Sequence, residues 1–424
     1  MAHTNINGLL PACQSAYRPF HSTETALVKV SSDILQNMDK KHVTFLVMLD
    51  LSAAFDTVDY SILLNILAND FGISGKAAAW LRSYLLNRTQ RMSINDSFSR
   101  DFNLKCGVPQ GSCLGPVLFV LYASRLFNIL SSHLPKAHTY ADDTQLYLSF
   151  KPDDMLSETE AINAMQCCIS DVRNWLIKSK LKINDSKTEF LIIGSQRMLS
   201  KISINSITVG NAFIKAVTEV RNLGVWFDKN FQFDTHISKI CSKSFAQLFK
   251  IRQVRKMLSE DACKTLLHAF VSCNLDYCNS LLYGLPDNLI TKLQRVQNAA
   301  ARLVTLTPKF CHISPILKDL HWLPVLYRIR FKVILLVFKA LNDLAPNYLS
   351  GLLSKREGLN YHLRSGSCIH LIVPRFNTSF GERAFAVAGP RLWNSLPPEL
   401  RLCPSISIFK SKLKTYLFRQ AFNV

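Results

Sequence analysis

Two adjacent aspartates, Asp142 and Asp143, constrain the fold of this chain more than any other feature. They stand between two short segments, 138–140 and 144–148, that mix apolar and aromatic side chains with polar ones. This pattern predicts a β-hairpin with both carboxylates at its tip. Paired carboxylates in such a turn would hold a divalent metal ion beside a bound nucleic acid. Taken alone, the four residues YADD are equally consistent with an acidic turn that has no function.

A third carboxylate, Asp50, follows a continuous apolar run over residues 44–49. A run of this length predicts a central strand that is covered on both faces. An ionised carboxylate directly after such a strand is costly unless it is solvated or paired with a cation. If this strand and the hairpin are neighbours in one sheet, the three aspartates converge. Phe55, five residues after Asp50, would lie near the same three aspartates. By itself, however, Phe55 is most simply a core residue.

A glycine-rich loop lies between the two acidic segments. Residues 107–116 hold three glycines and two prolines. Glycine lets a backbone approach a ligand closely, and the amide of Gln110 can both donate and accept hydrogen bonds. The loop is therefore a candidate ligand-binding element. Asp56 and Asp59, which come before the next predicted helix, are interpreted as helix caps.

Amphipathic periodicity predicts helices along much of the remaining chain. The first begins at the capping residues Ser22 and Thr23, and the others cover 61–71, 76–86, 117–122, 158–178, 235–257, 260–270, 289–303, 327–341 and 409–422. Strand pairs are predicted for 91–94 with 101–105 and for 180–184 with 188–193, and one more strand for 220–227. The last helix is basic, and nucleic-acid contact or packing with a solvated face explains it equally well.

Composition limits the class of protein and its partners. The chain has 424 residues, 48% of them hydrophobic, enough for two or three packed subdomains. Its net charge of +20 predicts a polyanionic partner, with nucleic acid ahead of an acidic membrane surface. Charge alone does not exclude a ribosomal or membrane-surface protein.

The cysteines and the apolar segments indicate where in the cell the protein is located. The 12 cysteines lack the paired spacing of zinc ligands and are interpreted as reduced thiols. Neither a secretory signal nor an apolar segment of bilayer length is found. We therefore expect the nucleus, the cytoplasm or both, with no secretion and no membrane.

Six motifs follow one another along the chain. They are QSAYRPFHSTETAL (14–27), LDLSAAFDTVDY (49–60), GVPQGSCLGPVLF (107–119), YADDTQLY (140–147), LKINDSKTEFLIIG (181–194) and VRNLGVWFD (220–228). In this order they resemble the reverse transcriptases of non-LTR retrotransposons, the LINE-like elements of the CR1, L2 and jockey type. HWLPVLYRIRFK (321–332) extends the resemblance less sharply, so that it covers most of the chain.

The resemblance implies an α+β right-hand polymerase fold with a ferredoxin-like palm. Its parts would be partial fingers at 1–43, a palm with inserted fingers elements at 44–195, the end of the palm with the primer-grip hairpin at 196–234, a helical thumb at 235–310 and a basic helical C-terminal extension at 311–424. Full-length proteins of this type also carry an endonuclease domain and further fingers motifs, and neither is found in this sequence. The chain is therefore expected to be N-terminally truncated and unable to nick target DNA.

The resemblance also implies roles for the acidic residues. Asp50 and Asp142 would be the principal ligands of two Mg²⁺ ions, or of Mn²⁺, with Asp143 supporting the site. Lys187 matches the lysine proposed to protonate pyrophosphate. Phe55 matches the steric gate, whose ring fills the space that a ribose 2′-hydroxyl needs and so favours deoxynucleotides.

The remaining matches concern binding. Gln110 and Gly111 would line the nucleotide and template pocket. Arg18 would lie near the triphosphate, although a lone arginine in a loop is more often a solvated charge. The primer grip would consist of Leu223, Gly224 and Val225.

The implied activity is that of an RNA-directed DNA polymerase, a nucleotidyltransferase. Its partners would be an RNA template, a DNA primer and dNTPs. The alternative is a catalytically silent, nucleic-acid-binding remnant of such an element, which the charge also fits. An RNA-copying RNA polymerase shares the palm but is disfavoured by the bulky Phe55.

Overall fold

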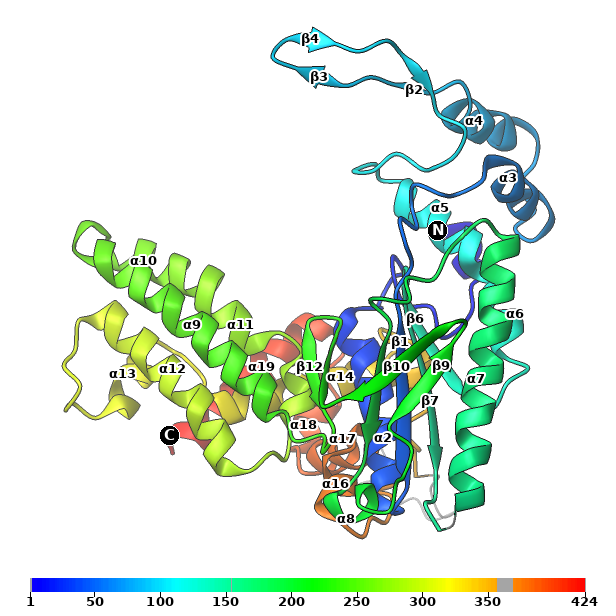
Figure 1. Ribbon diagram of the computed structural model, residues 1–424. Coiled ribbons are helices and arrows are strands. Elements are labelled where there is room, and N and C mark those ends of the chain that lie inside the picture. Colours follow the sequence, from blue (N-terminus) through cyan, green and yellow to red (C-terminus); the bar gives the residue numbers. More distant parts are fainter. Residues whose placement is uncertain (1, 154, 357–368, 424) are drawn as a thin grey trace. The chain divides into compact units, whose positions relative to one another are not determined.

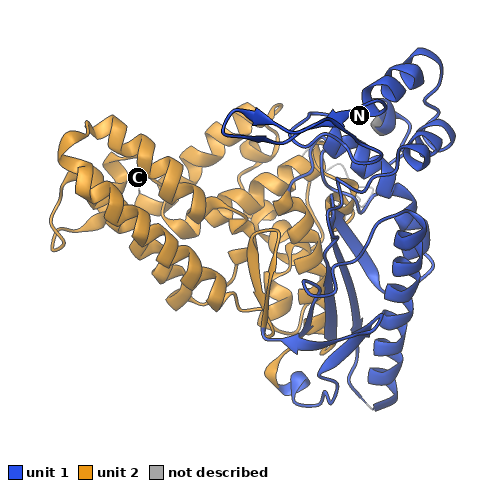
Figure 2. Cartoon of the chain, turned by 45° about the horizontal axis from the view of Figure 1, so that its top comes forward, with its two compact units in different colours: residues 1–22, 43–192, 197–218 blue, residues 23–42, 193–196, 219–424 orange. Residues whose placement is uncertain are grey.

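The computed structural model describes residues 2–153, 155–356 and 369–423. They form two compact units (Figure 2). Unit 1 comprises residues 1–22, 43–192 and 197–218, and unit 2 comprises residues 23–42, 193–196 and 219–424. Each unit is therefore assembled from segments that are distant in the sequence.

Unit 1 is built on a six-stranded sheet with the strand order β6-β7-β1-β8-β10-β9. The strands are β1 (Val43–Leu49), β6 (Lys136–Tyr140), β7 (Asp143–Phe150), β8 (Glu189–Ile193), β9 (Ser206–Val209) and β10 (Ala212–Val217). β1 is antiparallel to β7, whereas β10 is parallel to β8. Almost all of β1 is buried, as its apolar run predicts for a strand inside a sheet.

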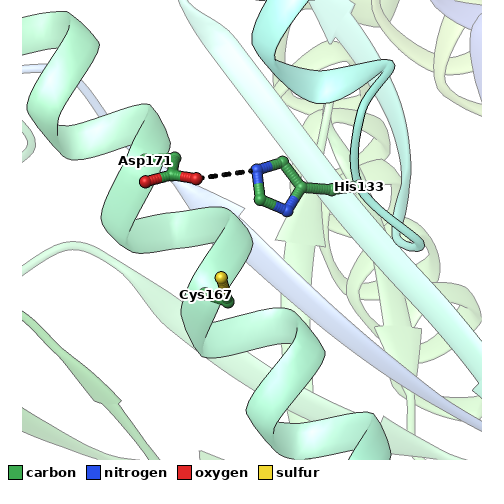
Figure 3. Close-up of side chains that lie close together, drawn as sticks. All are labelled: His133, Cys167 and Asp171. Carbon is green, nitrogen blue, oxygen red and sulfur yellow. Dashed lines mark ion pairs between the residues drawn. The ribbon is translucent and has the colours of Figure 1, made fainter.

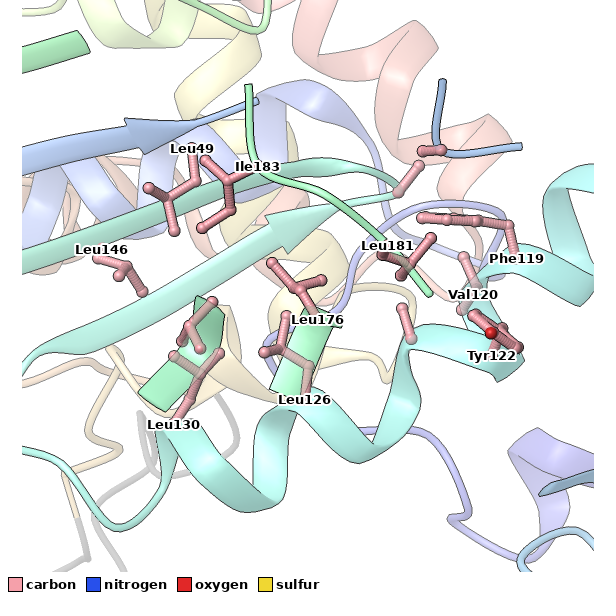
Figure 4. Packing of buried hydrophobic residues seen from close by; sticks show 14 of the residues in the cluster. Leu49, Phe119, Val120, Tyr122, Leu126, Leu130, Leu146, Leu176, Leu181 and Ile183 are labelled. Carbon is pink, nitrogen blue, oxygen red and sulfur yellow. The ribbon is translucent and has the colours of Figure 1, made fainter. Parts of the chain in front are cut away.

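Helix α7 (Met155–Lys178) packs along this sheet and confirms the helix predicted for 158–178 (Figure 1). Leu176 of α7, Leu146 of β7 and Leu126 point into one apolar core (Figure 4). Each fully buried leucine of this kind stabilises the fold by about 2 kcal/mol. The other helices are α1 (Ala2–Ile6), α3 (Tyr60–Asn69), α4 (Gly75–Leu85), α5 (Gly115–Tyr122), α6 (Leu126–Leu130) and, at the unit boundary, α8 (Gln196–Leu199), with a 3-10 turn at Ala123–Arg125.

A two-stranded ribbon extends from unit 1 between α4 and the glycine-rich loop (Figure 1). Its paired strands are β2 (Thr89–Gln90) with β5 (Phe102–Asn103) and β3 (Ser93–Ile94) with β4 (Ser97–Phe98). The predicted pairing of 91–94 with 101–105 is wrong, because the chain already reverses at Asn95 and Asp96. Both have positive φ, 47° and 62°, which a tight hairpin turn requires and these residue types tolerate.

The predicted hairpin of 180–184 with 188–193 is also wrong. Ile183 forms an antiparallel bridge with Leu51 instead, and the N–H of Asn184 donates to the carbonyl of Asp50 at 2.8 Å. This pairing places Ile183 in the core beside Leu49 (Figure 4), so the burial of an apolar side chain accounts for it.

Within its described residues, unit 2 consists mainly of helices, with the hairpin β11–β12. Its long helices are α2 (Thr23–Asp39), α9 (Asp234–Val254), α12 (Asp287–Thr305), α14 (Val325–Leu341) and α19 (Ile406–Phe422). The shorter ones are α10 (Glu260–Leu267), α11 (Cys273–Asp276), α13 (Ile313–Asp319), α15 (Asn347–Ser350), α16 (Ser379–Arg383), α17 (Phe385–Asn394) and α18 (Pro398–Arg401), with 3-10 or π turns at Arg255–Met257, His268–Ser272 and Asn279–Leu282. Phe338 of α14 stacks on Phe409 of α19, with ring centroids 4.1 Å apart. The apolar side of α19 is thus core packing.

The single strand predicted for 220–227 is instead the hairpin β11 (Glu219–Asn222) with β12 (Val225–Asp228). The reversal occurs at Leu223 and Gly224, which have positive φ of 44° and 86°. Glycine makes the second conformation accessible without strain.

Two further findings concern membrane-spanning helices and cysteines. None of the described helices is both long and apolar enough to cross a membrane. The cysteines in the described part of the chain form no disulfide.

Candidate active site

The three aspartates come together at one end of the unit 1 sheet. Leu49 of β1 is opposite Thr144 of β7, so that the next residue, Asp50, is level with Asp143. The two-residue turn of the β6–β7 hairpin carries Asp142 directly before Asp143. The predicted hairpin and the predicted neighbouring strand are both confirmed.

Crowding of like charges marks this site. Partial burial raises the pKa of Asp142, and the charge of Asp50 raises it further. Partial loss of solvent, together with the charges of Asp142 and Asp50, raises the pKa of Asp143 to about 6. Lys187 reaches the site, with its Nζ 3.8 Å from Asp50 Oδ2, but 70% of its side chain is exposed. The cluster thus favours a cation, and its donors are all carboxylate oxygens, which suit hard divalent ions.

The backbone of residues 13–15 pairs with β6 at the edge of the sheet. The N–H of Thr139 in β6 donates to the carbonyl of Cys13 at 2.9 Å, and the N–H of Ser15 donates to the carbonyl of Thr139 at 3.0 Å. The Ser15 hydroxyl lies 2.9 Å from Nε2 of buried His138. The motif at 14–27 gives no sign of this contact, because the two paired segments are far apart in the sequence.

Gln14 in this segment contacts the turn directly. Its side chain is 1% exposed, and Oε1 accepts the N–H of Ala16 at 2.8 Å and the N–H of Ala141 at 3.3 Å. Ala141 has a φ of 60°, in the left-handed region that alanine rarely adopts. Gln14 therefore supports the strained residue that precedes Asp142.

The glycine-rich loop packs against the segment that follows β1. A Cβ on Gly107 would lie 2.8 Å from the backbone oxygen of Asp56, so only glycine fits this approach. Gln110 Nε2 donates to both carboxylate oxygens of Asp56, at 2.9 and 3.1 Å. The helix-cap interpretation is therefore wrong for Asp56. It is confirmed for Asp59, whose carboxylate caps α3.

Phe55 is half-buried against Phe119 of α5, with ring centroids 4.8 Å apart. Packing thus fixes one side of the ring, while the remainder is open. Gly111 has a φ of +76°, and no atom lies within 4 Å of the position that its Cβ would take. Its backbone conformation, rather than lack of space, accounts for glycine there.

Arg18 makes local contacts in unit 1. Its Nη1 donates to the carbonyl oxygens of Pro11 at 2.7 Å and Gln14 at 3.0 Å. These bonds hold the loop that carries Gln14. In unit 2, Leu223, Gly224 and Val225 form the tip of the β11–β12 hairpin, where the Tyr277 hydroxyl donates to the carbonyl of Leu223 at 2.6 Å.

A second polar cluster involves α7 (Figure 3). His133, Cys167 and Asp171 each place a ligand-type atom within 4.8 Å of the others, and His133 Nε2 lies 3.1 Å from Asp171 Oδ2. Spacing of four residues puts the thiol and the carboxylate on one side of the helix. This cluster is not predictable from the sequence, because His133 is distant from α7 and belongs to none of the six motifs. We interpret it as a polar contact between His133 and Asp171 that ties residue 133 to α7.

Comparison with known proteins decides the family. The sequence profile described as "Reverse transcriptase (RNA-dependent DNA polymerase)" matches residues 2–227, more than half of the chain. The chain belongs to the reverse transcriptase family. Its α+β right-hand polymerase fold and its predicted membership of this family are thereby confirmed.

Curated relatives of this reverse transcriptase come from Drosophila melanogaster. It is 24% identical over 324 residues to "Probable RNA-directed DNA polymerase from transposon BS" and 26% identical over 324 residues to the corresponding protein of transposon X-element. It is 24% identical over 330 residues to the "RNA-directed DNA polymerase from mobile element jockey". Each match covers 74% of this chain and 34% of the relative, so the chain spans about a third of the length of these relatives. The predicted similarity to non-LTR polymerases of the jockey type is confirmed.

Solved structures similar to this reverse transcriptase include telomerases. The apo telomerase from Candida tropicalis gives a TM-score of 0.39 at 14% identity, over 77% of this chain and 53% of that one. The telomerase from Candida albicans in complex with a telomeric RNA fragment gives 0.37 at 12% identity, over 78% and 54%.

Proposed function

We propose that this chain catalyses RNA-directed DNA synthesis, adding deoxynucleotides to the 3′-hydroxyl of a DNA primer paired with an RNA template. The cluster of Asp50, Asp142 and Asp143 carries this proposal. Partial burial, and after it the repulsion between these like charges, raises the pKa values of Asp142 and Asp143, so a cation would stabilise the ionised cluster. A purely structural role would not require three carboxylates at one sheet end.

The donor set fits the divalent metal dependence of the family. Asp50 and Asp142 would hold two Mg²⁺ ions, or Mn²⁺, with Asp143 supporting them, because these ions prefer carboxylate oxygens. When bound, such ions lower the pKa of the attacking hydroxyl and stabilise the charge of the departing pyrophosphate. The three aspartates would orient the primer terminus and the triphosphate for this transfer.

Other side chains would complete the reaction. Lys187 is exposed beside Asp50 and would donate a proton to the leaving pyrophosphate. Phe55, fixed against Phe119, would occupy the space of a ribose 2′-hydroxyl and select deoxynucleotides. Gln110 and Gly111 would line the pocket for nucleotide and template.

The remaining assignments are part of the same proposal. Arg18 would lie near the triphosphate, and Leu223, Gly224 and Val225 would grip the primer. We assign residues 1–43 to the fingers, 44–195 to the palm, 196–234 to its end, 235–310 to the thumb and 311–424 to a C-terminal extension. The nucleus or the cytoplasm would be the location.

Primer extension tests the proposed activity. The purified chain is given an RNA template annealed to a DNA primer, Mg²⁺ and dNTPs, beside the variants Asp142→Asn and Asp153→Asn. Asp142→Asn removes one charge of the cluster and is expected to reduce extension by at least about 10³-fold. Asp153→Asn, which changes an exposed carboxylate paired with Lys151, is expected to leave the rate unchanged.

Equal extension by wild type and Asp142→Asn would contradict the proposal. Absence of extension by the wild type with RNA still bound would support the catalytically silent remnant instead. A preference for ribonucleotides would refute the role of Phe55 while leaving the aspartate cluster in place.

A further inference from the structure

The cluster of His133, Cys167 and Asp171 lies in unit 1, away from the candidate active site (Figure 3). It offers one imidazole nitrogen, one thiol sulfur and one carboxylate oxygen, and these three atoms all lie within 4.8 Å of one another. His133 precedes β6, whereas the turn that carries Asp142 follows it. Because a strand of this length is roughly 13 Å long, the cluster and the three aspartates are separate sites.

The spacing of the three atoms suits a tetrahedral metal ion. A Zn²⁺ ion binds histidine nitrogen and carboxylate oxygen at about 2.0–2.2 Å and cysteine sulfur at about 2.3 Å, so that neighbouring ligand atoms are about 3.3–3.6 Å apart. His133 Nε2 and Asp171 Oδ2 are already 3.1 Å apart. Cys167 is exposed, and its thiol has to approach by at most about 1.5 Å, which a change of rotamer provides.

The fold holds the histidine in place. The N–H of His133 donates to the carbonyl of Leu130 at 3.2 Å, and Leu130 is buried at the end of α6. Helix α6 packs on α7. Only 14% of the His133 side chain is exposed, whereas 52% of the Asp171 side chain is. The imidazole is therefore preorganised, and the open side of the cluster gives an ion a path of entry.

The other two side chains come from one side of α7. Cys167 and Asp171 are four residues apart, a spacing that brings helical side chains together and that recurs in helical zinc sites. The adjacent thiol of Cys168 is buried in the apolar core. Of these two neighbouring cysteines, only Cys167 can therefore serve the cluster.

The chemistry of the donors selects the metal. Mg²⁺ and Ca²⁺ prefer oxygen ligands, whereas Zn²⁺ accepts nitrogen, sulfur and oxygen in one site. A thiolate and a carboxylate together balance the charge of a divalent ion. Three protein ligands leave the fourth tetrahedral position for a water molecule.

We propose that His133, Cys167 and Asp171 bind one Zn²⁺ ion. The bound ion links the segment before β6 to α7 more strongly than the polar contact between His133 and Asp171 does alone. It therefore stabilises unit 1 without taking part in nucleotidyl transfer. The proposal does not depend on the proposed function.

Titration with Co²⁺ tests this site, because Co²⁺ replaces Zn²⁺ in tetrahedral sites and a bound thiolate gives it a strong charge-transfer absorption in the near ultraviolet. The purified, reduced chain is titrated in excess Mg²⁺, which occupies sites made of carboxylates alone. We expect the absorption to saturate at one Co²⁺ per chain and to disappear when Zn²⁺ is added.

The variants identify the ligands. Cys167→Ser is expected to abolish the absorption, whereas Cys106→Ser, which changes another exposed thiol of unit 1, is expected to leave it unchanged. His133→Gln and Asp171→Asn should each weaken Co²⁺ binding by at least about tenfold, since the loss of a ligand costs no less than the loss of a group that supports one.

Unfolding measurements show whether the variants still fold. Without added metal, wild type, Cys167→Ser and Cys106→Ser should have the same Tm, and Zn²⁺ should raise the Tm of wild type and of Cys106→Ser but not that of Cys167→Ser. Absence of the absorption in wild type would overturn the proposal, as would its persistence in Cys167→Ser. An absorption that needs Cys167 but is unaffected by both His133→Gln and Asp171→Asn would also overturn it, because a single thiol would then bind the ion. Each of these outcomes is independent of whether the chain synthesises DNA.

Discussion

Ala141 has a left-handed backbone conformation at the residue directly before Asp142. For a residue with a Cβ this conformation costs about 1 kcal/mol, so something must hold it. The hydrogen bond from its N–H to Gln14 does so, in a place where neither group is open to water. We therefore expect the position of Asp142, a proposed metal ligand, to depend on the side chain of Gln14.

Replacing Gln14 by methionine tests this dependence. Gln14→Met keeps the volume but leaves the N–H groups of Ala16 and Ala141 without their acceptor. We expect kcat for primer extension to fall by about tenfold through displacement of Asp142, with little change in RNA affinity. Stability should fall by about 1–3 kcal/mol. Steady-state kinetics and urea unfolding give these values.

Gln196→Met, at an exposed position, serves as the control and should match wild type. A loss of stability with an unchanged kcat would show that Gln14 only supports the fold. An unchanged kcat and an unchanged stability would remove any role for this hydrogen bond.

Patterns within single elements made part of the fold predictable. The apolar run of β1, the hairpin of Asp142 and Asp143 and the periodicity of α7 are local, and each was predicted from a few consecutive residues. Pairings between distant segments were not. Gln14 and Ala141 are 127 positions apart, and the bridge from Ile183 to Leu51 also joins distant segments, so neither leaves a periodic trace.

Turns produced two further errors for a related reason. The reversals at Asn95 and at Leu223 depend on backbone conformations with positive φ. Asn95-Asp96 is a recognisable turn signal, but it was read as part of the connection between two longer strands. Leu223 carries no such signal, and only the following Gly224 indicates a turn.

Helix α9 is joined to the β11–β12 hairpin by the buried side chain of His236. The N–H of Trp226 in β12 donates to Nδ1 of His236 in α9 at 3.5 Å. Burial lowers the pKa of His236 from 6.5 to about 4, because the charged imidazolium would lose its solvation. The packing of these elements therefore requires the neutral ring.

This pKa shift predicts how stability changes with pH. The folded pKa is below the unfolded value, so the unfolded state binds more protons between about pH 4 and 6.5. The contribution of neutral His236 to the free energy of unfolding is fully present above pH 6.5. It is lost as the pH falls toward 4, by on the order of 1.4 kcal/mol per pH unit. Urea unfolding followed by tryptophan fluorescence at several pH values measures it.

His236→Asn separates this histidine from the acidic groups that also titrate in this range. Asparagine retains an acceptor for the Trp226 N–H and cannot be protonated. The variant should therefore have a shallower dependence of unfolding free energy on pH between 4 and 6.5. Equal slopes for wild type and variant would show that His236 does not contribute.

The whole chain has 50 basic and 30 acidic side chains, which gives it a net charge of +20. A polyanion bound by such a surface releases counterions, so its affinity falls as salt rises. We expect the dissociation constant for RNA to increase by at least about tenfold between 50 and 200 mM salt. Anisotropy at several salt concentrations gives the slope of log affinity against log salt. Asp142→Asn should show the same slope, because it changes one acidic side chain and leaves the basic surface intact. Affinity that is independent of salt would mean that the net charge of the chain does not drive RNA binding.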